Sequence, residues 1–560
     1  MDHMTDRHIQ DYDVLIIGAG INGAGLFRDL SEQGVRCLIV DKGDYGSGTS
    51  AAPSRLIHGG LKYLETGEFR LVAESTYERN LLLKNAAHLV TPLPTLIPIY
   101  SWTKGIWPAI RTFFGSKTAP RSRGVLLVKI GLQLYDFYSS GNRQMPRHKM
   151  LSGRRALSSI PALSREIVAA GTYHDAAISA PERLVRELVQ DGIIAQNESR
   201  GMNWTKVEHY EKGLIYLTGS DGAQIIVRPK FLVNAAGPWI DAVNAVFGLQ
   251  TALIGGTKGS HILLDHPELM QQLDGRMIYF ESNDGRILLV FPYLGRALVG
   301  STDIPDTDPD AAACSNNETE YFLRSLTDLL PGLAFNRDQI VSSYAGIRPL
   351  PNSDGVAPGL ISRDHSAPQF PAETDRPFPV VALVGGKWTT FRAFAADVAD
   401  TVLAQLGLDR QTPTDALPIG GGRDMPRTSS EAADWIATTA LRTGANPDRM
   451  MDLLSRYGTT AHHIAEHEGP APAFIENTTF SEAEIDWIVR NEQVVHLEDI
   501  MLRRTQIVIT GQATRAVVRK IGAIAAIALG WEIDRADAEF ERTIIVLTQR
   551  HGITFHKDRE

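Results

Sequence analysis

The chain has little cysteine and no long apolar run. Only Cys37 and Cys314 occur in 560 residues, far apart and outside any CxxC motif. This pattern argues against a disulfide framework and a thiolate metal site, so redox chemistry would need a bound cofactor. No apolar run approaches the ~20 residues of a membrane-spanning helix, and residues 1–10 are too polar for a signal peptide. We therefore predict a cytoplasmic protein without a metal site.

An excess of basic residues is also missing. The 56 Lys and Arg are outnumbered by 65 Asp and Glu, which gives a formal net charge of −9. This balance disfavours general nucleic-acid binding, and we expect no nucleic-acid partner. A chain of 560 residues exceeds what one hydrophobic core usually organises, so two or three domains are predicted.

The strongest local pattern that is present lies near the start of the chain. Apolar runs predict buried strands at residues 14–17 and 37–40, with a helical pattern between them. The first strand leads into a GxGxxG pattern formed by Gly18, Gly20 and Gly23. Such glycines permit a tight turn against a pyrophosphate at a helix N-terminus, and Asp41 can accept from ribose hydroxyls. The pattern indicates a dinucleotide site without separating NAD from FAD.

A polar, glycine-rich segment follows at residues 46–64 and suits a backbone that runs along a flat ligand. Its last part, SRLIHGGLKYL at residues 54–64, resembles the signature of FAD-dependent glycerol-3-phosphate dehydrogenases of the respiratory type. These enzymes belong to the D-amino-acid-oxidase-like flavoprotein superfamily. The resemblance predicts an arginine where this chain has Lys62. The lysine keeps the positive charge but lacks the bidentate guanidinium fork.

The resemblance continues in order along most of the chain and fails only around a basic stretch. Further motifs are NAAGPW at 234–239, KGSH at 258–261, AGIRPL at 345–350 and GGKWTT at 385–390. The NAAGPW element resembles one that closes over FAD in this superfamily, so it favours FAD over NAD.

The motifs and the resemblance together imply three sets of site residues. The cofactor-binding set is Gly18, Gly20, Gly23, Asp41, Thr49, Ser50, Ser54, Leu56, His58, Gly59, Gly60, Ala236, Gly237, Trp239, Gly385, Gly386 and Lys387. The substrate-binding set is Lys62, Tyr63, Lys258, Arg348, Lys387 and Thr389. The catalytic set is His58, Arg348 and His261. A base with a pKa near neutrality is favoured, which makes His58 the first candidate and His261 the second.

The activity implied is oxidation of sn-glycerol 3-phosphate to dihydroxyacetone phosphate by hydride transfer to FAD, with electrons passed to membrane quinone. Three alternatives stay open. Lys62 and the altered segment 180–183 leave room for another polyol phosphate, such as erythritol phosphate. Oxygen is an alternative acceptor, and a nucleotide-binding membrane adaptor without activity is an alternative class, which the intact His58, Arg348 and Lys387 disfavour.

Residues 79–165 differ from the rest of the chain in charge. This stretch holds one acid, Asp136, against fourteen Lys and Arg. Within it, residues 101–130 interleave aromatic and basic residues, a composition that suits a lipid headgroup interface, where each base contributes about 1 kcal/mol near an anionic leaflet. We predict peripheral attachment to the inner face of the cytoplasmic membrane. The alternatives are a solvated basic face with ordinary core aromatics, and a patch that steers an anionic substrate.

We predict an α/β fold with a Rossmann-type FAD-binding domain, an inserted antiparallel-sheet substrate domain and a C-terminal helical domain. The FAD-binding domain is expected at 1–100, 165–250 and 345–408, the substrate or cap domain at 101–164 and 251–344, and the helical domain at 409–560. Strands are expected at 277–280, 287–292, 297–300 and 380–384, and helices at 391–406, 487–498 and 514–531. Packing or subunit contacts, with a homodimer as one option, are the default role for the helical domain.

Overall fold

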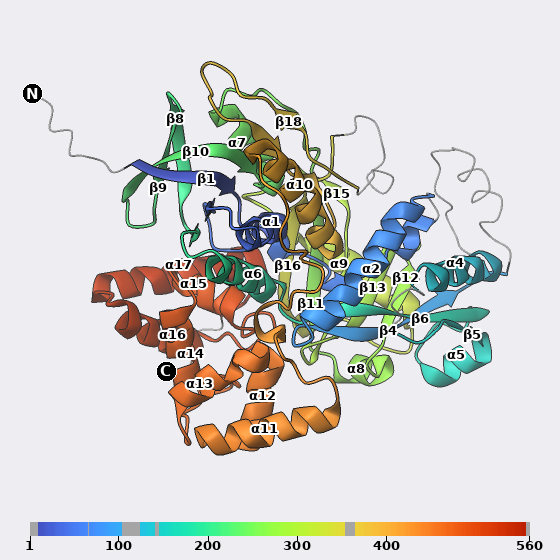
Figure 1. Cartoon of the computed structure of the whole chain (residues 1–560). Helices are drawn as coiled ribbons and strands as arrows, with labels where there is room; N and C mark the ends of the chain where they lie inside the picture. The colour runs from blue at the N-terminus through green and yellow to red at the C-terminus, as the bar shows by residue number, and fades with distance from the viewer. Residues whose placement is uncertain (1–8, 65–66, 103–123, 140–144, 353–363, 556–560) are drawn as a thin grey trace, which may run out of the picture.

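The computed structural model describes residues 9–64, 67–102, 124–139, 145–352 and 364–555, apart from the side chain of Lys62. Residues 9–406 contain two large β-sheets with helices packed on them, and a group of helices follows at the C-terminal end of the chain (Figure 1). This arrangement confirms the predicted α/β class with a helical C-terminal part. Within the described residues, no helix is both long enough and apolar enough to cross a bilayer.

The first sheet is built around the predicted strand at 14–17, which begins earlier than expected, at Ile9. Its neighbours on both sides are parallel to it, and its last four residues are buried because an apolar cluster lies on each face of the sheet. The main path of the sheet is β18 (Gln369–Phe370), β19 (Val380–Ala382), β10 (Gln224–Asn234), β1 (Ile9–Ile17), β2 (Cys37–Val40) and β7 (Arg200–Met202), and β10 also carries β9 (Leu214–Thr218) and β8 (Lys206–Glu211).

Three helices pack together over one face of this sheet: α1 (Ile21–Glu32), α6 (Pro181–Ala195) and α10 (Phe391–Leu406). The predicted helix at 391–406 is confirmed with the same bounds. Gly25 allows α1 and α10 to approach closely, since a Cβ there would lie 2.7 Å from the ring of Phe391.

The second sheet is mostly antiparallel and contains the predicted strands at 277–280, 287–292 and 297–300, which are confirmed. Its main path is β15 (Ile304–Pro305), β11 (Thr257–Leu264), β14 (Arg296–Gly300), β13 (Ile287–Tyr293), β12 (Met277–Glu281), β4 (Val90–Ile99), β6 (Ala169–Ile178) and β3 (Leu56–Ile57). β16 (Ile340–Arg348) also pairs with β11, and β5 (Lys149–Ser152) with β6. Helices α5 (Gly153–Ser159), α8 (Pro267–Leu273) and α9 (Asn316–Leu329) contribute to the apolar cluster on one face, and α2 (Phe69–Asn85) and α4 (Val125–Tyr138) to a second cluster with β4 and β6.

The domain boundaries remain a proposal, and strand pairing bears on them at two places. β4 and β6 fall within segments that the sequence assigns to the FAD-binding domain. They nevertheless pair with each other and join the second sheet through β12. We therefore propose that the substrate domain includes both strands.

The predicted strand at 380–384 is interrupted. Residues 380–382 form β19 beside β10, whereas β20 (Val384–Gly385) pairs with β17 (His365–Ser366) in a separate two-stranded sheet. The strand is interrupted because the chain stops pairing with β10 and pairs with β17 instead. The glycine turn at residues 385–386 follows directly.

The C-terminal helices are α11 (Ser429–Thr443), α12 (Pro447–Tyr457), α13 (Ala461–Glu468), α14 (Glu482–Asn491), α15 (Leu497–Asp499), α16 (Arg515–Leu529) and α17 (Ile533–His551), and α7 (Ile240–Val246) lies in the first half of the chain. The predicted helix at 514–531 is confirmed as α16.

The predicted helix at 487–498 is wrong in its second half. Gln493 takes a left-handed backbone conformation, and the amides of Val495 and His496 donate to the Asp499 carboxylate, which ends one helix and begins another.

We expect Phe391→Ala to lower the free energy of unfolding by about 3 to 5 kcal/mol, because the ring is 1% exposed and fills the contact between α1 and α10. Urea unfolding followed by circular dichroism measures the effect. Leu441→Ala is the control, since Leu441 is 88% exposed on α11. Equal midpoints for the two variants would show that the contact adds no stability.

Candidate active site

A cavity of about 1640 Å³ lies where the carboxyl ends of β1, β2 and β10 face the second sheet. In open α/β sheets, ligands bind at this end of the strands. The cavity begins beside Asp41 and extends past His58 to the strands of the second sheet. Its walls therefore come from both sheets and from the segment that connects β2 with β3.

The glycine turn predicted at residues 18–23 forms the floor of the cavity. Gly18 has φ +106°, and a Cβ there would lie 2.5 Å from the carbonyl oxygen of Ala235. Gly20 also lines the cavity. Gly23 does not line it, because this residue packs on the Gly18 carbonyl, where a side chain would overlap the backbone. Gly23 thus shapes the turn from behind.

Asp41 lies at the end of β2 and lines the cavity. Its carboxylate accepts from the amides of Ala19 at 2.7 Å and Gly43 at 2.9 Å. Burial raises the pKa of Asp41 to about 6, against the opposing effect of these two amides. The carboxylate is thereby fixed beside the glycine turn, where the sequence places a ribose.

The small hydroxyl residues after β2 tie this segment to both halves of the fold. Ser50 Oγ accepts from the amide of Ile21 at 2.9 Å, at the start of α1. Thr49 Oγ1 donates to the carbonyl of Ile347 at 2.5 Å, on β16. Thr49, Ser50, Ser54 and Leu56 all line the cavity, as the sequence predicts for a backbone along a flat ligand.

The HGG sequence at 58–60 is held by a buried polar network. The Gly59 amide donates to the Tyr135 hydroxyl at 3.0 Å and to the Asp175 carboxylate at 3.1 Å, so Gly59 does not line the cavity. Arg79 binds both groups, with Nη1 at 2.7 Å from the hydroxyl and 3.0 Å from the carboxylate. Sequence reasoning missed this buried network, although an aspartate among the small and apolar residues of β6 is a signal for it.

Lys387 and Tyr63 form one cationic corner of the cavity. The Lys387 ammonium lies 3.6 Å from the centre of the Tyr63 ring and donates to Ser75 Oγ at 3.0 Å. Lys387 is 8% exposed, so its charge acts in a partly desolvated site. Thr389 lies in the next turn and accepts from the His58 amide at 3.3 Å.

Arg348 provides a second cation at the end of β16. Its guanidinium lies 3.1 Å from Asp303 and donates to Ser301 Oγ and the Thr302 carbonyl, both at 3.0 Å. Gly259 makes room for it, since a Cβ at that position would overlap the guanidinium. The glycine of the KGSH motif therefore serves to place Arg348.

His261 lies on β11, stacked against Tyr344 with ring centres 4.8 Å apart. Its Nε2 is hydrogen-bonded to Ser54 Oγ at 2.9 Å, while Nδ1 is buried without a hydrogen-bond partner among the described residues. Burial, and then the positive charges of Arg348 and Arg55, lower the pKa of His261 well below its usual value. The imidazole is therefore neutral at pH 7.

One predicted substrate-binding residue, Lys258, is not brought to the cavity. Lys258 does not line it: its ammonium pairs with Glu318 at 3.1 Å and donates to the Ala313 carbonyl at 3.1 Å. The carboxylate at the start of α9 holds the lysine there, so its prediction as a substrate ligand finds no support. The side chain of Lys62 lies outside the described part of the chain.

The remaining predicted cofactor residues do line the cavity: Gly60, Ala236, Gly237, Trp239, Gly385 and Gly386. Asn22, within the glycine turn, donates through Nδ2 to the Gly385 carbonyl at 3.2 Å, and its Oδ1 is buried without a hydrogen-bond partner among the described residues. A cradle that a Cβ would fill, a fixed carboxylate and a buried acceptor fit a dinucleotide with a flat ring system. The fold and the cavity define a dinucleotide-binding protein.

Comparison with known proteins agrees with this class. Residues 13–374 match the family model "FAD dependent oxidoreductase", and residues 412–536 match "C-terminal domain of alpha-glycerophosphate oxidase". The chain therefore belongs to the FAD-dependent oxidoreductases and, among them, to the glycerol-3-phosphate dehydrogenase and oxidase flavoproteins, with FAD as the cofactor.

Two relatives show how far the similarity extends. A glycerol-3-phosphate dehydrogenase of Synechocystis sp. is 31% identical over 95% of each chain, and an aerobic glycerol-3-phosphate dehydrogenase of Staphylococcus epidermidis is 28% identical over 90% of this chain and 88% of its own.

Among solved structures, the glycerol-3-phosphate dehydrogenase of Bacillus halodurans complexed with FAD has a TM-score of 0.73 at 21% identity and covers 96% of this chain and 95% of its own. The FAD-bound L-alpha-glycerophosphate oxidase of Mycoplasma pneumoniae has a TM-score of 0.54 at 18% identity. It covers 73% of this chain and 98% of its own. At these identities, both comparisons support the fold alone.

We expect Asp41→Asn to raise the dissociation constant of FAD by about 10- to 100-fold at pH 7.5, because a charge-assisted hydrogen bond is worth about 1.5 to 3 kcal/mol. In the unsubstituted protein, FAD affinity should fall as the pH drops through the Asp41 pKa of about 6, since protonation removes the charged acceptor. Fluorescence titration of the apoprotein between pH 5 and 8 measures both effects. Unchanged affinity, or the same pH profile in both proteins, would remove Asp41 from the cofactor site.

Proposed function

We propose that this protein oxidises sn-glycerol 3-phosphate to dihydroxyacetone phosphate with FAD, and that it passes the electrons to membrane quinone. The observation that carries the substrate assignment is a pair of cations, Lys387 and Arg348, lining the cavity that also holds His58 and the cofactor-binding turn. The relatives' names, glycerol-3-phosphate dehydrogenase, support the same substrate.

The two cations suit an anionic substrate with a neighbouring hydroxyl. A guanidinium offers two parallel donors to a phosphate, and an ammonium acts as a point charge. Arg348 already binds Asp303 at 3.1 Å, so its position is fixed before the substrate arrives. Binding of the phosphate through these groups would place C2 and its hydroxyl near the flavin, and positioning of this kind supplies much of the rate.

The geometry favours His58 over His261 as the base. The Nε2 atom of His261 is bound to Ser54, its Nδ1 atom is buried, and its low pKa makes it a poor proton acceptor at pH 7. His58 is half-buried and lines the cavity, with its backbone held by Thr389. Bound FAD would accept the hydride from C2, and His58 would take the proton of the hydroxyl.

An exposed apolar stripe on α4 supports the membrane part of the proposal. Leu126, Ile130, Leu134 and Phe137 recur at helical spacing and are 50%, 45%, 37% and 70% exposed. The opposite side of the helix is buried, because Val128 and Leu132 pack against β6 at Gly171. One helix thus presents apolar side chains both to the core and to the exterior, as an interfacial helix does.

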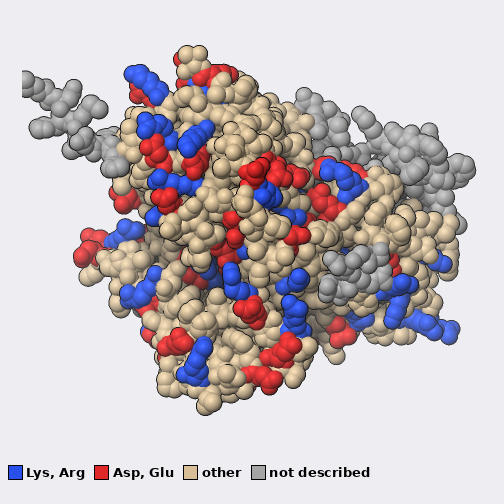
Figure 2. Space-filling model, viewed as in Figure 1, with Lys and Arg blue, Asp and Glu red and all other residues tan. Residues whose placement is uncertain are grey.

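Basic side chains lie on elements next to α4. Arg147, Lys149, Arg154 and Arg155 are exposed on β5, on α5 and just before β5, and blue side chains gather over this region at the lower right of the molecule in Figure 2. Met150 of β5 meets Val128 and Leu132 of α4 around Gly171, so the two elements are neighbours. Residues 103–123, the centre of the predicted membrane-binding segment, lie outside the described residues. A homodimer stays a prediction.

Anaerobic titration of the purified holoprotein tests the substrate and acceptor together. We expect sn-glycerol 3-phosphate to bleach the flavin absorbance and erythritol phosphate to do so poorly. Addition of a short-chain quinone should then restore the absorbance faster than oxygen does. Bleaching by erythritol phosphate alone would make that compound the substrate in place of sn-glycerol 3-phosphate. Faster recovery of the absorbance with oxygen than with quinone would make the protein an oxidase.

We expect His58→Asn to slow flavin reduction by sn-glycerol 3-phosphate by 10² to 10⁴-fold, the range that a general base contributes. His261→Asn should reduce the rate less, since that ring is neutral and already bonded to Ser54. Stopped-flow absorbance of both variants, matched for FAD content, gives the comparison. A larger loss in His261→Asn would exchange the two assignments.

The triple variant Leu126→Ser, Ile130→Ser, Phe137→Ser should bind vesicles of phosphatidylglycerol and phosphatidylcholine at least tenfold more weakly, because three apolar side chains lose their contact with lipid. Co-sedimentation at 50 mM salt measures binding. Leu441→Ser is the control, since it removes one 88% exposed side chain from a distant helix. Equal binding by all three proteins would exclude α4 as the attachment site.

A further inference from the structure

We propose that the C-terminal helical domain is part of the cofactor site, because Arg503 and Arg504 hold the FAD-binding loop at 41–47 in place through Asp44. The loop and the two arginines are about 460 positions apart in the chain. The proposal rests on FAD as the cofactor and needs no particular substrate.

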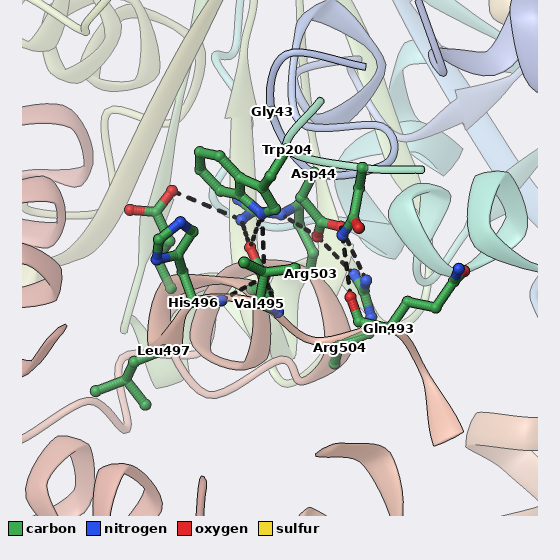
Figure 3. Close-up of polar contacts among 12 residues, drawn as sticks. Gly43, Asp44, Trp204, Gln493, Val495, His496, Leu497, Arg503 and Arg504 are labelled. Carbon is green, nitrogen blue, oxygen red and sulfur yellow. Dashed lines mark hydrogen bonds and ion pairs between the residues drawn. The ribbon is translucent and has the colours of Figure 1, made fainter. Parts of the chain in front are cut away.

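Asp44 is the point of attachment (Figure 3). Its side chain is fully buried and accepts from Arg503 Nε at 2.6 Å and from Arg504 at 2.7 and 2.9 Å. Asn203 Nδ2 adds a fourth hydrogen bond at 2.8 Å. Although burial alone would raise the pKa of Asp44, Arg504 and Arg503 lower it below its usual range, so the carboxylate stays ionised.

The two arginines are themselves fixed by acids of their own domain and by α6. Arg503 Nη2 lies 2.5 Å from Asp499, and Arg504 donates to the Glu492 carbonyl at 3.1 Å. The Glu492 carboxylate binds Arg183 of α6 at 2.8 and 3.1 Å. Every charge in the cluster has a partner of opposite sign. Loss of one partner would leave an uncompensated buried charge, which is strongly destabilising.

Short contacts connect Asp44 to the cofactor-binding atoms. Asp41 accepts from the amide of Gly43, and the Gly46 amide donates to the Ala19 carbonyl at 2.9 Å, within the glycine turn. A shift of the loop at Asp44 would therefore change both the ribose acceptor and the pyrophosphate turn.

Trp204 makes a second connection. Its amide donates to the Gly43 carbonyl at 2.8 Å, and its indole Nε1 lies 3.2 Å from both carboxylate oxygens of Asp499. Arg542 of α17 lies 4.9 Å from the centre of the Trp204 ring. Trp204, Arg503 and Arg542 all line the cavity, so the C-terminal domain forms part of its wall at this end. These are positioning residues, because they act on the loop.

The alternative is that the cluster only stabilises the fold. A variant of a comparable arginine elsewhere in the domain distinguishes this role from a role in FAD binding. Arg504 is 4% exposed and binds Asp44 and Glu492. Arg449 is similarly buried, at 6% exposed, but it binds Glu468 and Glu484 within the C-terminal domain. Arg449→Lys and Arg504→Lys should therefore destabilise the fold to a similar degree.

Only Arg504→Lys and Asp44→Asn should weaken FAD binding, by tenfold or more in the dissociation constant measured by flavin fluorescence with the full-length apoprotein. Arg449→Lys should stay within twofold of the unsubstituted protein. If the FAD dissociation constants of Arg504→Lys and Asp44→Asn also stay within twofold, the cluster is structural and the proposal is wrong.

Hydrogen exchange of the unsubstituted protein tests the same link without a variant. Addition of FAD to the apoprotein should slow amide exchange at residues 492–504 as well as at 13–60. Protection confined to residues 13–60 would overturn the proposal, whatever the variants show.

Discussion

The fold depends on close backbone contacts at the carboxyl ends of the parallel strands β1, β2 and β10. The Gly18 amide donates to Val40 of β2 at 2.8 Å, and the amide of Ala235 donates to Ile17 at 2.8 Å. A Cβ on Gly18 would intrude between them. Because this junction contains almost no side-chain atoms, it leaves the helix N-terminus and the Asp41 carboxylate open to a dinucleotide. Every other part of the cavity is arranged around this point.

The second sheet supplies what the junction lacks. Its strands carry the Arg348 guanidinium and the His261 imidazole, while the turn after β20 brings the Lys387 ammonium to the cavity. Each cation is held by neutral or acidic groups before any ligand binds. The cost of desolvating these charges is met in the folded protein, which is what preorganised electrostatic stabilisation requires.

The sequence alone was sufficient for the features that depend on local pattern. Strand, glycine turn, strand and acid predicted the dinucleotide site, and apolar segments separated by polar turns predicted β12 to β14. The resemblance of separated motifs indicated FAD and the glycerol-3-phosphate dehydrogenases. Local pattern failed where long-range contacts intervene: Gln493 breaks a helix that its neighbours favour, and Val384 leaves the strand to pair with β17.

Only the tertiary structure decided which motif residues meet at the cavity. Lys258 and Arg348 both belong to family motifs, yet Glu318 holds the lysine away while the space above Gly259 admits the arginine. Gly59 and Gly23 lie behind the site, because their neighbours in space are Asp175 and the Gly18 carbonyl. The attachment of Asp44 to Arg504 was equally unreadable in the sequence. A motif determines residue types and their spacing, whereas contacts between residues hundreds of positions apart follow from how the two sheets and the helices pack.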